Sequence, residues 1–86
     1  MSDPAHSKEH KQWLAQVAEE LGLEAGVLEA EDALLNMTAS VAHGPSRPAA
    51  PITAYLIGYA AGSRGIDASE AANKLSVLAK NWRAEG

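Results

Sequence analysis

The chain has 86 residues and a mass of 9.0 kDa, which is enough for one domain, because a single hydrophobic core typically serves roughly 100–150 residues. Its 47% apolar and 21% charged residues are ordinary for a globular protein and argue against disorder. The lack of cysteine excludes disulfides, thiolate metal sites and cysteine catalysis, and the net charge of −4 argues against nucleic-acid binding. We therefore expect a single domain over residues 1–86.

The first half of the sequence predicts two helices joined by a short connection. Ser7 is a suitable N-cap for a helix over residues 7–21, and Gly22 follows where a left-handed residue is wanted. Apolar side chains recur on one face of this helix at Trp13, Leu14, Val17, Ala18 and Leu21. The connector 23–28 is expected to add Leu23, Val27 and Leu28 to the core. A second helix is expected over residues 31–42, with its first acids at the positive end of the helix dipole.

Residues 43–51 contain three prolines and a glycine, which predicts a loop rather than a helix. Pro51 then suits the first position of a third helix over residues 52–63. This helix carries an apolar stripe of Ile52, Tyr55, Leu56 and Tyr59, and small residues recur at Ala54, Gly58 and Gly62. Since small residues let a neighbouring helix approach closely, we expect the third helix to be the central and most buried one.

A fourth helix is predicted from the capping pattern that begins at Asp67, with Glu70 three residues later. It extends to about Arg83, and its inner face is expected to hold Ala71, Leu75, Leu78, Ala79 and Trp82. No segment alternates in the way of a strand. The predicted fold class is all-α: a compact four-helix bundle with a proline-rich loop between the second and third helices.

Charge is distributed unevenly along the chain. Residues 1–43 contain eight acids and two bases, a balance of −6, whereas residues 44–86 contain three acids and five bases, a balance of +2. The acidic half is either a solvated helical face or an interaction surface.

The proline-rich loop holds the candidate binding residues. Arg47 presents a guanidinium suited to a carboxylate or phosphate, and His43 and Ser46 lie beside it in sequence. Thr53 and the free amides at the start of the third helix add further hydrogen-bond donors. The set either binds an anion or a partner's acidic group, or Arg47 ties the loop to a helix end or to a carboxylate of the acidic half.

Enzymatic and metal sites find little support. His6 and His10 have a spacing that suits zinc, but no third ligand accompanies them, and residues 1–6 are expected to be frayed. No serine or threonine has a nucleophile signature. An acyl-carrier domain would need a serine at the start of the second helix, where this chain has Ala33. We expect no catalytic residue and no bound metal.

Targeting signals are also missing from the sequence. The first ten residues have no apolar segment of the secretory type, and residues 49–62 are shorter than the roughly 20 residues that cross a bilayer. We therefore expect a cytoplasmic protein with neither membrane nor nucleic-acid partners.

Three segments resemble a family of small actinobacterial helical domains of unknown function. They are WLAQVAEELG at residues 13–22, VAHG at residues 41–44 and RPAAPITAYLIGYAAG at residues 47–62. The likeness covers about residues 13–82, and its most distinctive part is the block that leads from Arg47 into the third helix. Members of this family are similar to domains fused to molybdenum cofactor guanylyltransferase. Others are encoded beside formate dehydrogenase and its accessory proteins.

The resemblance implies a non-enzymatic accessory or adaptor protein for a molybdenum-cofactor enzyme, formate dehydrogenase first, or for its cofactor maturation. It supplies no catalytic residue. Two alternatives remain at this stage: direct binding of molybdopterin-guanine dinucleotide or a guanine nucleotide at the loop, and a small structural subunit of a formate dehydrogenase complex. In the leading hypothesis, residues 43–51 and the start of the third helix contact a protein partner.

Overall fold

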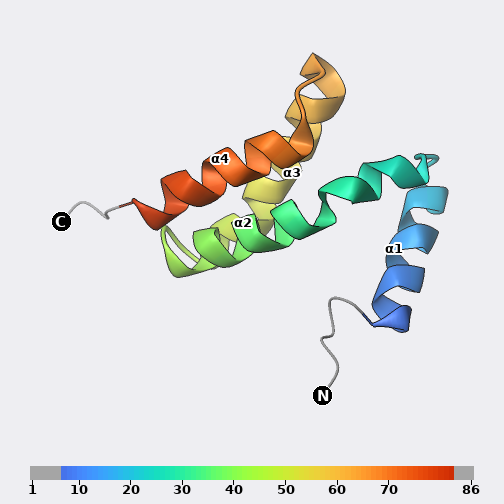
Figure 1. Ribbon diagram of the computed structural model, residues 1–86, viewed down its shortest axis with the longest axis horizontal. Helices are drawn as coiled ribbons and strands as arrows, with labels where there is room; N and C mark the ends of the chain where they lie inside the picture. The colour runs from blue at the N-terminus through green and yellow to red at the C-terminus, as the bar shows by residue number, and fades with distance from the viewer. Residues whose placement is uncertain (1–6, 83–86) are drawn as a thin grey trace.

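The computed structural model describes residues 7–82 and confirms the all-α fold class, with four helices and no strand in that range. The elements are α1 (Lys8–Glu20), the short 3₁₀ helix η2 (Ala25–Ala30), α2 (Glu31–His43), α3 (Ala49–Arg64) and α4 (Ala68–Lys80). In Figure 1, α2 and α4 run side by side, α3 crosses behind them, and α1 stands apart at the acidic end of the chain.

The helix ends follow the predicted local chemistry. The Ser7 hydroxyl accepts a 3.0 Å hydrogen bond from the amide of His10, and the Asp67 carboxylate accepts one of 2.8 Å from the amide of Glu70. Each side chain satisfies an amide that has no partner within its helix. Gly22, with a φ of 70°, takes the left-handed conformation that follows a helix end.

The core lies where α2, α3 and α4 meet, and α2 packs most extensively against α4. Its fully buried members are small except for Met37, Val41 and Ile57; the others are Ala50, Ala72 and Ala79. Ser40 and Ser76 join α2 to α4 through a 2.7 Å hydrogen bond between their hydroxyls. Because the residues along this seam are small, the two helices approach closely. They contact each other through small side chains and backbone rather than through large side chains.

Helix α1 is attached differently from the prediction. It lies against η2, and an apolar hollow of about 210 Å³ separates it from α2. A 2.7 Å contact between His10 Nε2 and Glu31 Oε2 links it to the start of α2. Four side chains expected in the core are exposed instead: Trp13, Leu21, Leu23 and Val27. Ala18 is the buried residue of α1, because this helix packs against η2 and not into the three-helix core.

The loop between α2 and α3 is shorter than the predicted 43–51. His43 ends α2, and α3 begins at Ala49, so residues 44–48 form the loop. Pro51 lies inside the first turn of α3. A proline is tolerated there because the first amides of a helix have no intrahelical acceptor to lose.

The prediction that α3 is the central, most buried helix is wrong. Its stripe of large side chains is exposed, with exposed fractions of 60% at Ile52, 65% at Tyr55, 58% at Leu56 and 64% at Tyr59. The opposite face packs inward, with Ala50 and Ile57 buried and Ala54 partly so. The small side chains of that face let the α3 backbone come close to α2 and α4, and the large ones are left outside.

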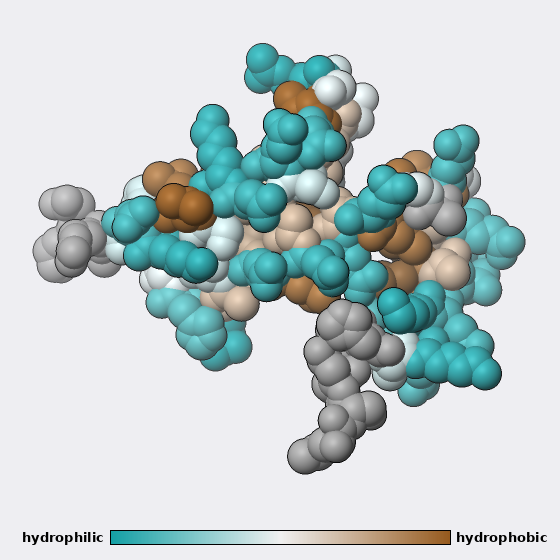
Figure 2. Space-filling model, viewed as in Figure 1, coloured by the Kyte–Doolittle hydropathy of each residue, from teal (hydrophilic) through white to brown (hydrophobic). Residues whose placement is uncertain are grey.

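The small residues of α3 also divide between two environments. Ala54 contacts the core, but a Cβ added at Gly58 or Gly62 would meet nothing within 4 Å. The expected close neighbour on the glycine flank is therefore absent from the described part of this chain. Figure 2 shows the face formed by α2 and α4, which is mainly hydrophilic, and α3 lies behind it.

Candidate binding groove

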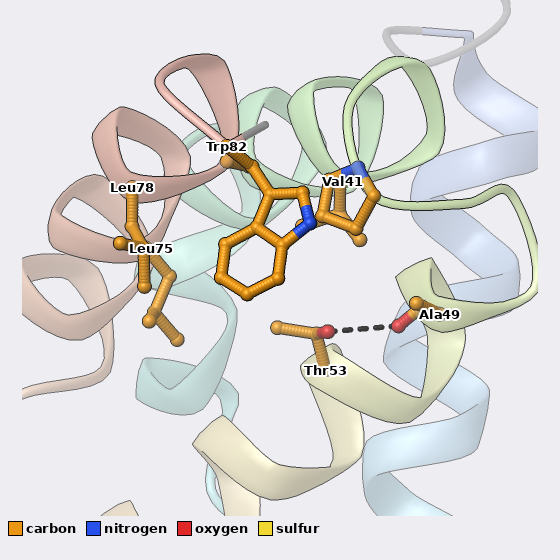
Figure 3. Close-up of a pocket in the computed structure, with 8 residues that line it drawn as sticks. Val41, Ala49, Thr53, Leu75, Leu78 and Trp82 are labelled. Carbon is orange, nitrogen blue, oxygen red and sulfur yellow. Dashed lines mark hydrogen bonds between the residues drawn. The ribbon is translucent and has the colours of Figure 1, made fainter. Parts of the chain in front are cut away.

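An apolar groove opens where the end of α2, the start of α3 and the end of α4 meet (Figure 3). It has a volume of about 200 Å³. Its lining is Val41, Pro45, Ala49, Thr53, Leu75, Leu78, Ala79 and Trp82. The loop and the first turns of α3, which the sequence singled out as a contact surface, thus form one wall of the groove, and α4 forms the other.

Trp82 stands at the mouth of this groove. Its amide donates a 3.2 Å hydrogen bond to the carbonyl of Ala79, which turns the chain just beyond the end of α4. In Figure 3 the indole lies between Val41 on the right and Leu75 and Leu78 on the left, with Thr53 below it, and Trp82 is 54% exposed. Leu78, one turn earlier, is equally exposed. Both were expected on the inner face of the fourth helix, and they instead form the rim of the groove.

The Thr53 hydroxyl adds little polarity to the groove, because it is already hydrogen-bonded within α3. Thr53 Oγ1 donates a 2.8 Å hydrogen bond to the carbonyl oxygen of Ala49, one turn back in α3 (Figure 3). The hydroxyl proton is therefore committed to the helix backbone, and apolar atoms dominate the surface offered to a ligand.

The four candidate residues named from the sequence do not converge on one point. Thr53 lines the groove, whereas His43 lines a separate hollow that it shares with Lys80 and Trp82. Ser46 and Arg47 are exposed in the loop. Within residues 7–82 the Arg47 guanidinium has no carboxylate within ion-pair distance, so it remains available to a ligand from outside.

The segments that form the groove carry basic side chains but no acidic ones. No aspartate or glutamate occurs in residues 33–66 or in residues 71–82, which together supply every wall of the groove. Arg47 lies in the adjoining loop and Lys80 on the last turn of α4. The described acids of the first half lie on α1, on η2 or at its N-cap, and on the first turn of α2, at the other end of the molecule (Figure 1).

The described residues hold no metal-binding cluster, and the groove is small for a dinucleotide. Residues 7–82 contain no group of three or more acidic or histidine side chains that could hold a metal ion. His10 is paired with Glu31, and His6 lies outside the described residues. The groove is also smaller than the ~300–1,000 Å³ of typical small-molecule sites, and its polar lining is sparse. The groove is therefore too small to enclose molybdopterin-guanine dinucleotide, whereas the neighbouring hollow lined by His43 and Lys80 is larger, at about 450 Å³.

The groove was difficult to predict from the sequence because its lining comes from three separated segments. Val41, Leu75 and Leu78 have the helical spacing of core residues, and spacing alone does not show which of them meet solvent. One residue could have indicated the groove from the sequence. Trp82 is the second residue after the end of α4 at Lys80. An aromatic side chain at a helix end has fewer neighbours in its own chain to cover it.

These features define a small all-α domain whose recognisable site is an apolar, acid-free surface groove. The chain belongs to the DUF6457 family, a domain of unknown function, whose model matches residues 5–86. No curated protein and no solved structure gives a significant match to the chain. Among residues 7–82, no helix combines the length and apolar character that crossing a membrane requires.

Proposed function

We propose that this domain is a non-enzymatic accessory module that binds a protein partner in the groove between α3 and α4. The observation that carries the proposal is the groove itself, an apolar hollow with exposed Leu78 and Trp82 at its rim and no acidic residue in its walls. Exposed tryptophan and leucine beside a preformed hollow are typical of surfaces that anchor a partner's side chain.

The size of the groove and the basic residues beside it support one kind of ligand. A volume of about 200 Å³ takes one or two large apolar side chains. Arg47 and Lys80 stand near its edge, so an acidic group beside the inserted side chain would gain a charge-assisted hydrogen bond. The partner segment is therefore one that carries a leucine, methionine or aromatic residue next to aspartate or glutamate. Two prolines stiffen the loop and lower the entropy lost on binding.

The partner in this proposal is a cytoplasmic molybdenum-cofactor enzyme, with formate dehydrogenase as the leading candidate, or a factor that matures its cofactor. This finer assignment rests on the family resemblance of residues 13–82. A module that stays bound at fixed stoichiometry would be a small subunit of the enzyme, and one that dissociates would be a maturation factor.

The test uses the full chain and purified formate dehydrogenase from the same host. The Trp13→Phe variant leaves Trp82 as the remaining indole, so its fluorescence reports occupancy of the groove. We expect saturable binding that Arg47→Ala and Leu78→Ser each weaken at least ~10-fold, since rim anchors dominate binding of this kind. Val77→Ser is the matched control, because Val77 is 58% exposed and does not line the groove.

Three outcomes distinguish the alternatives. If neither Arg47→Ala nor Leu78→Ser changes the affinity for the partner, the contact lies elsewhere and the groove proposal is contradicted. Absence of binding to formate dehydrogenase and to its maturation proteins removes the molybdenum assignment. A fluorescence change on adding a guanine nucleotide alone, without a protein, favours the direct-binding alternative.

A further inference from the structure

We infer that the exposed stripe of α3 is a self-association surface, and that two copies of this chain pair through antiparallel α3 helices. The stripe consists of Ile52, Tyr55, Leu56 and Tyr59, which occupy one face of the helix at helical spacing. All four side chains are between 58% and 65% exposed. The stripe faces away from the core, whereas the groove is lined by Ala49 and Thr53, so this inference is independent of the proposed partner site.

The size of the stripe suits a weak dimer. A large aromatic side chain can bury about 150–250 Å², so four large side chains at these exposures present roughly 500 Å². That is as large as the largest apolar patch of a typical monomer. Two such stripes would bury about 1,000 Å² in total, which is the lower limit for a specific interface.

The charge distribution of the chain allows two copies to meet through this stripe. The helix from Ala49 to Ser63 has no charged side chain, so two copies can approach without burying a charge or opposing equal charges. The acids that give the chain its negative charge lie mainly on α1, η2 and the first turn of α2, away from α3 (Figure 1). A second copy brings an equally uncharged stripe to this face, so the pairing leaves no charge of the stripe buried without a partner.

The order of side chains along the stripe is self-complementary. A two-fold axis that crosses α3 between Tyr55 and Leu56 places each Tyr55 opposite Leu56 of the second copy. The same axis places Ile52 opposite Tyr59, so every aromatic ring meets an aliphatic side chain. This reciprocal pairing is what an isologous interface requires.

The two glycines support the same arrangement. Glycine in a helix interior lowers stability relative to alanine. Neither Gly58 nor Gly62 has a neighbour within 4 Å of its missing Cβ that would require glycine at that position. Both lie along one edge of the stripe. In an antiparallel pair these edges fall on the same side, where the absence of side chains lets the two backbones approach closely.

The test is sedimentation velocity on the full chain over concentrations from micromolar to millimolar. We expect a monomer–dimer equilibrium, which Tyr59→Lys shifts toward monomer by at least ~10-fold in dissociation constant, because it places two ammonium groups in an apolar interface. Val77→Lys is the matched control, since Val77 is an exposed apolar residue of α4 that is 58% exposed. Circular dichroism should show unchanged helicity in both variants.

A second variant separates association from folding. Gly58→Ala with Gly62→Ala should raise the thermal midpoint of the monomer, because alanine favours the helix and meets no neighbour. It should at the same time weaken the dimer by filling the shared edge. A wild-type chain that stays monomeric at millimolar concentration, or a dimer that survives Tyr59→Lys, overturns the inference, and the stripe then belongs to a partner of different sequence.

Discussion

A Cβ atom added to Gly44 would lie 2.5 Å from the carbonyl oxygen of Ala79, so the end of α2 rests directly on the backbone of α4. Gly44 has a φ of −93° and a ψ of −98°, and the close approach of the Ala79 carbonyl leaves no room for a Cβ atom at this position. Because the nearby atoms belong to backbone, they cannot move aside as a flexible side chain would.

Gly44→Ala should accordingly destabilise the protein by about 2 kcal/mol, in the range found for overpacked sites. Urea denaturation followed by circular dichroism measures the free energy of unfolding. Gly26→Ala serves as the control, since a Cβ at Gly26 meets nothing within 4 Å. Equal stability of the two variants would show that α2 and α4 are not in backbone contact at this point.

The hydroxyl pair of Ser40 and Ser76 should behave as a coupled unit. Ser76 is buried, and its 2.7 Å hydrogen bond to Ser40 is part of the seam between α2 and α4. Each single change to alanine leaves one hydroxyl without its partner and should cost about 1 kcal/mol. The double variant should cost less than the sum of the two, and a double-mutant cycle of unfolding free energies measures this coupling. Strict additivity would contradict the bond.

The cap at Asp67 offers a conservative comparison. Its carboxylate accepts the hydrogen bond from the Glu70 amide, so Asp67→Ala should destabilise the protein by about 1 kcal/mol. Asp67→Asn keeps an oxygen acceptor in the same place and should retain most of the stability. Thermal unfolding of both variants checks the prediction, and similar losses in both would assign the effect to charge rather than to capping.

The contact between His10 and Glu31 should govern how firmly α1 is held. Both side chains are largely but not fully covered, so the pair contributes at most about 1 kcal/mol. His10→Ala should accelerate hydrogen exchange of the α1 amides and leave exchange in α2 and α4 unchanged, because α1 packs on η2 rather than on the core. Uniform acceleration throughout the chain would show instead that α1 is part of the cooperative core.

Local chemistry made three of the helix ends predictable, but not the start of α3 and not the face that each helix buries. Ser7, Gly22 and Asp67 act through neighbours within a few residues, and the structure confirms all three. The burial of α3 was mispredicted because this helix is apolar on nearly every side. Periodicity identified the large stripe as a contact face without showing which molecule it contacts, and the smaller face around Ile57 packed inward.

The binding surface was predictable only on the side of the loop. Proline and glycine marked residues 43–51 as irregular, and part of that segment does border the groove through Pro45 and Ala49. The opposite wall required knowing that α4 returns alongside α2, which depends on packing between residues far apart in sequence. Leu78 and Trp82 were therefore assigned to the interior, where helical spacing alone would place them.

The separation of acids from the groove also gives the molecule an electric dipole moment. Negative charge gathers on α1, η2 and the first turn of α2, while Arg47 and Lys80 stand near the groove. An approaching acidic partner would be steered so that the groove faces it before contact, which raises the association rate. Added salt should slow that encounter while leaving the dissociation rate nearly constant, since screening acts on long-range attraction and the anchored side chains are held by apolar contact.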